Sequence, residues 1–271
     1  FAGESDIFDT WFTSSLTPQI ASGWELDPER HRKLFPADVR PQSHEIIRTW
    51  AFYTIAKAML HEDRVPWRHA AISGWVLDPD RKKMSKSRGN VVVPTPLIEE
   101  HTADAVRYWA ASARLGTDTA VDEKVFRVGK RLATKIFNAG KFVLAQSAAL
   151  HPVSAELDRA FAAELRALVD SATESFGRFQ HAQALAETES FFWNGFTDTF
   201  LELAKARARD EAPGAAAARG SAVATLRLGL SVLLRLFAPY LPFICEEGWS
   251  WSFAGETGHA RQRESGTGWS P

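Results

Sequence analysis

The chain has 271 residues, which is enough for one or two domains with a buried core. Hydrophobic residues make up 45% of the sequence and charged residues 24%, as is usual for globular proteins. The formal net charge of −1 excludes bulk attraction to nucleic acid, so any RNA binding must come from local patches. The single cysteine, Cys245, excludes an internal disulfide and favours a reducing compartment.

The sequence predicts neither a signal peptide nor a membrane span. Its first six residues lack the basic start and the apolar run of a signal peptide. The most apolar region, residues 222–244, is interrupted by Arg227, Arg235, Pro239 and Pro242. Because the sequence does not begin with methionine, we expect it to be a fragment of a longer protein.

The first third of the sequence alternates between helical and strand-like patterns. Residues 45–61 have the apolar spacing of a helix. The positions on its apolar face are Ile47, Trp50, Thr54 and Ala58. Residues 70–77 form an apolar strand candidate, and residues 96–113 form the next predicted helix, with Thr102 as a possible cap. This alternation predicts an α/β fold.

From residue 121 onward the pattern is helical, with four apolar stripes. They comprise Val125, Val128, Leu132, Ile136, Ala139 and Val143; Leu157, Phe161, Leu165, Leu168 and Ala172; Phe192, Phe196, Thr199, Phe200 and Leu203; and Leu226, Leu230, Leu233 and Phe237. Four amphipathic helices predict an all-α bundle. We therefore expect an α/β part at residues 1–120, a helical bundle at 121–250 and a loose tail at 251–271.

The loop at residues 78–90 is the most informative segment of the sequence. Asp78-Pro79-Asp80 opens the loop and Gly89-Asn90 closes it, and both are typical of turns. Between them lie Arg81, Lys82, Lys83, Ser85, Lys86, Ser87 and Arg88. Cations, hydroxyl groups and a glycine suit a polyanion such as a triphosphate, because they bring positive charge and N–H or O–H donors to its oxygen atoms. The alternative interpretation is a solvated basic loop without a ligand. The position of the loop between two strand-like runs disfavours this alternative.

Residues 83–87, with the sequence KMSKS, resemble the loop of that name in class I aminoacyl-tRNA synthetases. Further segments occur in the order and spacing of the valyl-tRNA synthetase family: residues 9–15 (DTWFTSS), 43–50 (SHEIIRTW), 74–78 (GWVLD), 138–143 (NAGKFV) and 193–207. The resemblance implies the second half of a Rossmann-like class I nucleotide-binding fold, followed by an α-helical anticodon-binding domain.

The same resemblance implies that valine is activated by ATP and then transferred to tRNA(Val), with Mg²⁺ accompanying ATP and no tightly bound cofactor. Negative charge grows on the leaving pyrophosphate, and Lys83 and Lys86 are expected to stabilise it from a mobile loop. The ATP-binding residues that the resemblance implies are His44, Glu45, Gly74, Val76, Lys83, Met84, Ser85, Lys86 and Ser87.

Two of these assignments have structural alternatives. Glu45 is expected to accept hydrogen bonds from the ribose hydroxyls, but Ser43 and Glu45 stand where the class usually has glycine and aspartate. A helix N-terminus capped by Ser43 is a compatible interpretation. Backbone groups at Gly74 and Val76 are expected to meet the adenine, and a simple strand end is the alternative.

Trp11, Ile46 and Trp50 match the positions that line the valine pocket in this family. Two indoles and a β-branched side chain would make a small apolar cavity, although tryptophans on helices more often belong to the core. Such a pocket rejects threonine only about a hundredfold, a figure for which valyl enzymes are themselves the reference case, so editing is needed. The family's editing domain and HIGH motif do not occur in this sequence, and we expect negligible adenylation by this chain alone.

The first bundle helix carries the predicted RNA-binding residues. Lys124, Arg127, Arg131 and Lys135 share one face, which suits an RNA backbone as well as a solvated surface. Phe196, Phe200 and Leu203, in the segment that resembles the anticodon-binding helices, are expected in the core. No metal site is predicted, because Cys245 has no cysteine partner and the histidines lack ligand spacing.

The expected partners are tRNA(Val), valine, ATP and the missing N-terminal half of the catalytic domain, in a cytoplasmic enzyme that is monomeric when complete and binds no membrane. One alternative is a non-catalytic tRNA-binding fragment or paralogue. Another is a related class I synthetase such as the isoleucyl enzyme, which Trp11 and Trp50 disfavour. Because half of the nucleotide fold would leave apolar surface uncovered, we also expect poor solubility.

Overall fold

The computed structural model describes residues 3, 6–7 and 9–253, and the chain divides into two compact units. Unit 1 consists of Phe1–Asn90 and Leu115–Val121, and unit 2 consists of Val91–Arg114 and Asp122–Pro271. The tail predicted to be loose begins at residue 251, but Phe253 is buried in the core cluster. Its residues from 254 onward lie outside the described residues. The assignment of functional domains on either side of residue 120 stays a prediction.

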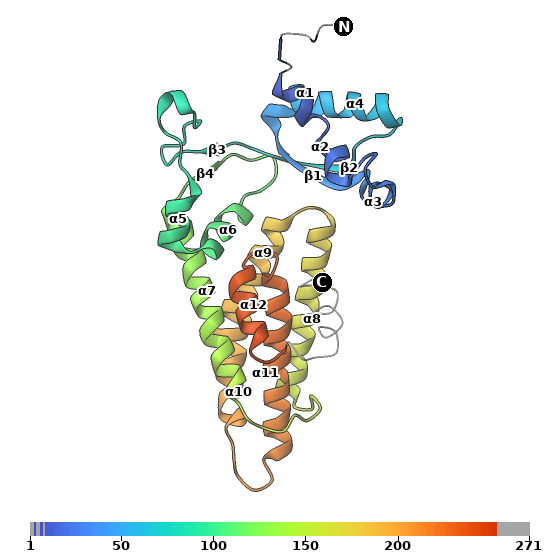
Figure 1. Cartoon of the computed structure of the whole chain (residues 1–271). Coiled ribbons are helices and arrows are strands. Elements are labelled where there is room, and N and C mark those ends of the chain that lie inside the picture. Colours follow the sequence, from blue (N-terminus) through green and yellow to red (C-terminus); the bar gives the residue numbers. More distant parts are fainter. Residues whose placement is uncertain (1–2, 4–5, 8, 254–271) are drawn as a thin grey trace. The chain divides into compact units, whose positions relative to one another are not determined.

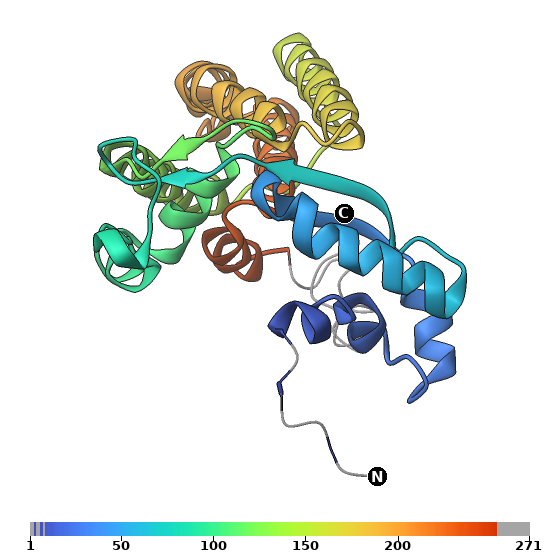
Figure 2. The same cartoon turned by 90° about the horizontal axis from the view of Figure 1, so that it is seen from above.

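Unit 1 is built on two parallel strands joined by a helix (Figure 1). Its elements are α1 (Thr10–Ser14), α2 (Thr17–Ser22), α3 (Pro28–Leu34), β1 (Ala37–Ser43), η1 (His44–Ile46), η2 (Ile47–Ala51), α4 (Phe52–Glu62), β2 (Trp67–Ser73), β3 (Val76–Leu77), η3 (Lys86–Arg88) and β4 (Thr119–Ala120). Ala37 lies opposite Trp67, and Ser43 opposite Ser73. In Figure 2, α4 lies along these strands, and α1 and α2 contact α4.

The helix predicted at residues 45–61 has three parts. It starts as the 3₁₀ turn η1, continues as the π-helical turn η2 and becomes α-helical only at Phe52. The wider π turn shifts the phase of the following residues. Trp50, Thr54 and Ala58 are therefore buried as predicted, whereas Ile47 is exposed.

The strand predicted at residues 70–77 is two strands. β2 begins earlier, at Trp67, and the chain leaves it at Gly74-Trp75 before β3. β1, which pairs with β2, was not predicted at all. Its polar sequence includes Pro41, which lacks the N–H that a strand interior normally donates, so no strand pattern is visible locally.

The described residues of unit 2 form helices and no strands. Its elements are α5 (Pro94–His101), α6 (Ala103–Ala111), α7 (Glu123–Leu144), α8 (Glu156–Gly177), α9 (His181–Ser190), the π-helical η4 (Phe191–Phe200), α10 (Leu201–Ala208), α11 (Ala216–Phe237) and α12 (Pro242–Ser250). The predicted helix at residues 96–113 breaks at Thr102, whose φ is +84°. The Thr102 hydroxyl accepts from the Ala105 amide at 3.4 Å, which confirms the predicted cap.

Helices α5 and α6 pack within unit 2, although the sequence placed them before the predicted boundary. Tyr108 of α6 belongs to the bundle core. A Cβ on Gly129 of α7 would lie 2.8 Å from the Tyr108 Cβ, so the glycine permits the close contact between these helices.

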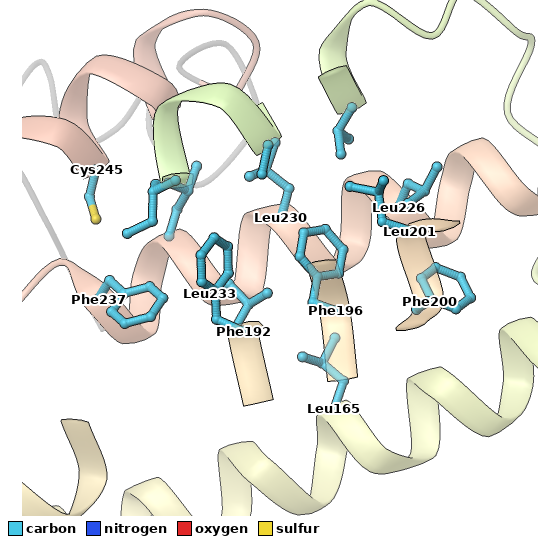
Figure 3. Packing of buried hydrophobic residues seen from close by; sticks show 14 of the residues in the cluster. Leu165, Phe192, Phe196, Phe200, Leu201, Leu226, Leu230, Leu233, Phe237 and Cys245 are labelled. Atoms are coloured by element: carbon cyan, nitrogen blue, oxygen red, sulfur yellow. The ribbon is translucent and has the colours of Figure 1, made fainter. Parts of the chain in front are cut away.

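The core of unit 2 is centred on α11 (Figure 3). Leu226, Leu230, Leu233 and Phe237 are each at most 2% exposed, as predicted. Phenylalanine rings from η4 pack against them. Burying a side chain of this size contributes about 1.5–3 kcal/mol relative to leaving it exposed. By length and composition alone α11 could cross a membrane, but 61% of its apolar window is buried inside the protein, as expected of a core helix.

Three of the four predicted stripes are wrong in detail. Thr199 and Leu203 are exposed, Leu203 by 56%, because the π-helical η4 rotates the apolar face, and Leu201 and Ala204 are buried instead. Near the start of α7, Phe126 and Gly129 are buried in place of the predicted Val125 and Val128, whereas the rest of that stripe is buried as predicted. Three further predicted core positions, Val125, Val128 and Leu157, are not buried either. Phe126 faces inward because its ring meets residues of α5 and α6, which the four-helix interpretation did not include.

Candidate functional site

The basic loop at residues 78–90 is closed by its first and last polar residues. Asp78 accepts the Lys82 amide at 2.7 Å through Oδ1 and the Asn90 side-chain amide at 2.8 Å through Oδ2. Asn90 also accepts the Ser85 amide at 3.0 Å and donates to the Lys83 carbonyl at 3.2 Å. The bonds from Lys82 and then Asn90 lower the pKa of the Asp78 carboxyl, which keeps it charged. The turn chemistry read from the sequence thus shapes the whole loop.

The two lysines predicted to act in catalysis have different surroundings. The Lys83 ammonium lies 3.0 Å from Glu45 Oε2 and 4.4 Å from the centre of the Trp75 ring. Lys86 lies in η3, which is followed by Gly89 with φ +67°, and it has no ion pair within residues 9–253. The hydroxyl groups of Ser85 and Ser87 are 3.2 Å apart, and Met84 is half-buried.

Glu45 and His44, the residues predicted to contact the ribose, lie in η1 directly after β1. Glu45 Oε2 accepts from Lys83 Nζ and from Trp75 Nε1, each at 3.0 Å. The bond from Lys83 is the main reason that the pKa of Glu45 is lowered. His44 Nδ1 lies 3.2 Å from the Ser73 carbonyl oxygen, and its ring centre is 4.9 Å from that of Trp75.

Trp75 was not predicted as a site residue, although it contacts three residues that were. It stands between Gly74 and Val76, both predicted to line the site. An aromatic side chain directly before a basic loop was the sequence signal that could have indicated it. Its side chain touches His44, Glu45 and Lys83, although these residues come from two separate segments.

Gly74 is required by packing. A Cβ at this position would lie 2.4 Å from the carbonyl carbon and oxygen of Thr117, closer than real contacts allow. Val76 pairs with Thr119 in the β3–β4 ladder and is 45% exposed. The expected contact of this segment with adenine stays a prediction.

The capping interpretation of Ser43 is wrong. Ser43 precedes η1, but its side chain bonds no helical amide. Its hydroxyl is buried and, like Gln42 Oε1, has no hydrogen-bond partner among the described residues. The chain enters a 3₁₀ turn here, which does not bring an amide to the serine.

Trp50, predicted for the amino-acid pocket, packs as a core residue. It is 5% exposed and stacks on Trp67 with ring centres 5.7 Å apart. Its Nε1 donates to the Ser14 carbonyl at 2.9 Å, and the Arg40 guanidinium lies 3.9 Å from its ring centre. Burial lowers the pKa of Arg40.

Trp11 instead lines a cavity of about 360 Å³. The other lining residues are Asp9, Phe12, Ser15, Tyr53, Ala56 and Lys57. Ile46 is half-buried, and neither Ile46 nor Trp50 lines this cavity. The structure thus connects Trp50 to the end of α1, which carries Trp11, through Ser14, but it does not bring the three residues around one cavity.

The predicted RNA-binding cations of α7 fall into two pairs. Lys124 and Arg127 are exposed, with Arg127 3.4 Å from Glu123. Arg131 and Lys135 lie over the Trp193 ring, at 5.4 Å and 5.3 Å from its centre. Lys135 also lies 3.7 Å from Asp198 Oδ1. The second pair of side chains therefore contacts η4, although Arg131 is itself exposed.

Arg207 and Asp158 of unit 2 form a structural ion pair. Arg207, in the segment that resembles the anticodon-binding helices, donates to both oxygens of the fully buried Asp158, at 2.9 Å and 2.5 Å. Ser221 donates to the same carboxylate at 2.7 Å. Burial opposes the charge on Asp158, but these bonds hold its pKa below the usual value. No cluster of three or more His, Cys, Asp or Glu side chains suited to a metal ion occurs in the described part of the chain.

Comparison with known proteins identifies the family. Residues 1–122 match the family model of class I tRNA synthetases (I, L, M and V), and residues 158–266 match that of the anticodon-binding domain of tRNA ligase. The chain is 55% identical over 257 residues to the valine–tRNA ligase of Thermobifida fusca, which covers 93% of this chain and 29% of that relative. The chain belongs to the class I tRNA synthetase family.

A second relative of this synthetase chain gives the same result. The valine–tRNA ligase of Bifidobacterium longum (strain DJO10A) is 48% identical over 280 residues, covering 94% of this chain and 30% of the relative. The chain thus spans less than a third of the length of these curated relatives.

Solved structures of synthetases confirm the predicted fold class, an α/β part followed by a helical bundle. Mycobacterium tuberculosis methionyl-tRNA synthetase bound by methionyl-adenylate superposes with a TM-score of 0.75 at 21% identity, over 92% of this chain and 52% of that chain. The ternary LeuRS–tRNA–LeuAMS complex from Agrobacterium radiobacter K84 gives a TM-score of 0.73 at 23% identity, over 96% of this chain and 33% of that chain.

Proposed function

We propose that this chain is the part of a valine–tRNA ligase that carries the KMSKS loop and the anticodon-binding bundle. The observation that carries the proposal is the 3.0 Å contact between Lys83 and Glu45, two groups expected on the phosphates and the ribose of the same ATP. They come from separate segments, and the fold brings them to one place. The 55% identity to a valine–tRNA ligase supports valine as the amino acid.

In this reaction the valine carboxylate attacks the α-phosphate of ATP. A new P–O bond forms, the bond to the β-phosphate oxygen breaks, and pyrophosphate leaves with the electron pair. Positive charge from Lys83 and Lys86 stabilises the developing charge on the pyrophosphate. A hydroxyl group at the 3′ end of tRNA(Val) then attacks the valyl carbonyl, and AMP leaves. Mg²⁺ accompanies ATP and neutralises part of the phosphate charge.

The remaining assignments are part of the same proposal. Trp11, Ile46 and Trp50 form or support the valine pocket, with Trp50 acting from a packed position. Lys124 and Arg127 offer solvent-directed cations to the tRNA backbone. We further propose that the complete enzyme is monomeric and cytoplasmic.

The test uses Thermobifida fusca valine–tRNA ligase in which the matching segment is replaced by this chain. Valine-dependent ATP–pyrophosphate exchange is expected from this chimera and not from the 271-residue chain alone. Lys86→Ala in the chimera should slow exchange by about a hundredfold or more, since one lost charge-stabilising donor costs about 2.7–4 kcal/mol. Exchange within a few fold of the unmodified chimera contradicts the role of Lys86, and strong exchange from the chain alone contradicts its assignment as a partial site.

A further inference from the structure

The backbone around Trp75 is held on both sides. Its amide donates to Asp118 Oδ1 at 2.8 Å, and the preceding Gly74 lies directly against the Thr117 backbone. The following residue, Val76, pairs with Thr119. These contacts all lie within unit 1 and fix the direction in which the indole leaves the chain.

The indole uses two chemically different surfaces. Its Nε1 donates in the ring plane to Glu45 Oε2 at 3.0 Å, while its π face lies 4.4 Å from the Lys83 ammonium. Because Lys83 itself donates to the same Glu45 oxygen at 3.0 Å, the three side chains form a closed triangle. Among apolar side chains, only tryptophan combines an N–H donor with a strongly cation-binding ring.

The triangle supports an ion pair that would otherwise be weak. The side chains of Lys83 and Glu45 are 50% and 43% exposed. An exposed pair of long side chains contributes little, because ordering both of them offsets the Coulomb attraction. A third group that contacts both partners reduces their freedom before any ligand arrives, and such preorganisation strengthens binding.

We propose that Trp75 is a positioning residue that holds the Glu45 carboxylate and the Lys83 ammonium together for the ribose and phosphates of ATP. The proposal rests on the proposed function, which assigns those two groups to ATP. Both bonds to Glu45 end on Oε2, so Oε1 has no donor within the described part of the chain and is left to accept from a ribose hydroxyl.

The first experiment measures ATP–pyrophosphate exchange in the chimera with two variants. Trp75→Leu removes both contacts and should raise the KM for ATP about tenfold, the combined effect of a charge-assisted hydrogen bond and a cation–π contact at an exposed site. Trp75→Phe keeps the ring below Lys83 and should give an intermediate KM. We expect no change in the KM for valine, because Trp75 contacts Glu45 and Lys83 and neither of these residues is expected to bind the amino acid.

Trp24 provides the matched control, because it lies in the same unit and its ring meets His61 at 5.0 Å rather than any predicted ATP-binding residue. Trp24→Leu and Trp24→Phe should leave the KM for ATP unchanged. An unchanged KM for ATP in Trp75→Leu overturns the proposal. So does an equal loss for ATP and valine, which indicates a general packing role.

A second experiment keeps the two failures apart. If the unmodified chimera shows no exchange, the proposed function fails. The contacts of Trp75 with Glu45 and Lys83 are then tested by NMR on the 271-residue chain itself. The indole N–H resonance of Trp75, assigned by its loss in Trp75→Phe, should move in Glu45→Gln and in Lys83→Met, whereas that of Trp24 should not. A Trp75 resonance that is indifferent to both substitutions overturns the positioning role.

Discussion

Arg207 and Asp158 form a two-point ion pair in unit 2, with nitrogen–oxygen distances of 2.9 Å and 2.5 Å and the carboxylate fully buried. The two residues belong to α10 and α8, so the pair joins two helices of the bundle. Because Ser221 of α11 donates to the same carboxylate, a third helix is tied to this point.

Arg207→Met should strongly destabilise unit 2. Removing one partner of a buried pair leaves the other charge uncompensated, which typically costs about 3–5 kcal/mol. Lys205→Met is the control, since Lys205 pairs with Glu202 at the surface and such pairs contribute about 0–1 kcal/mol. Urea unfolding of both variants measures the difference, and equal midpoints would show that the Asp158 pair contributes nothing.

Lys83→Met should raise the pKa of Glu45 toward the ordinary value for a glutamate, about 4.3. The bond from Lys83 is the largest cause of its lowered pKa. Because the folded-state pKa is depressed, the stability from this contact is present above the unfolded pKa and is lost as the pH falls through the folded one. Lys82→Met is the control, since Lys82 pairs with Asp80 at 3.5 Å. An NMR titration of the Glu45 carboxyl that is identical in the two variants contradicts the assignment.

Gly74→Ala should destabilise unit 1 by about 1–3 kcal/mol, the usual cost of overpacking. The new Cβ would lie 2.4 Å from the Thr117 backbone, which is not a flexible side chain that can move aside. Gly177→Ala is the control, because a Cβ added at Gly177 would have no neighbour within 4 Å, and this substitution should be neutral or slightly stabilising. Chemical unfolding compares the two, and a Gly74→Ala protein as stable as the control would rule out the close contact.

Lys124→Ala and Arg127→Ala in the chimera should each make the slope of log K against log salt concentration for tRNA(Val) binding less steep. The expected change is about 0.7–0.9 for each variant, the effect of losing one phosphate contact. Lys135→Ala should have a smaller effect, because its ammonium already lies near Asp198 and over Trp193. Filter binding at several salt concentrations gives the slopes. Equal slopes for all three variants would contradict the division of these cations into two pairs.

Local patterns in the sequence predicted the features that depend on short-range periodicity and turn chemistry. The stripe from Leu226 to Phe237 is buried as expected. Four apolar residues at helical spacing lie on one face of a helix, and packing that face against the core buries all of them. The loop from Asp78 to Asn90 closes through the residues whose side chains are typical of turns. The lysines of that loop and Glu45 were recognisable for the same reason, since each motif lies within a few consecutive residues.

Tertiary structure decided what depends on distant partners. β1 is a strand because β2 lies beside it, although Pro41 conceals the pattern. Leu203 is exposed because the π-helical segment before it rotates the apolar face. A prediction from regular α-helical spacing does not include this rotation. Trp75 acquires a candidate role only when the fold brings Glu45 and Lys83 to its two surfaces. A sequence specifies its local geometry residue by residue, whereas a contact between remote segments also depends on every turn between them.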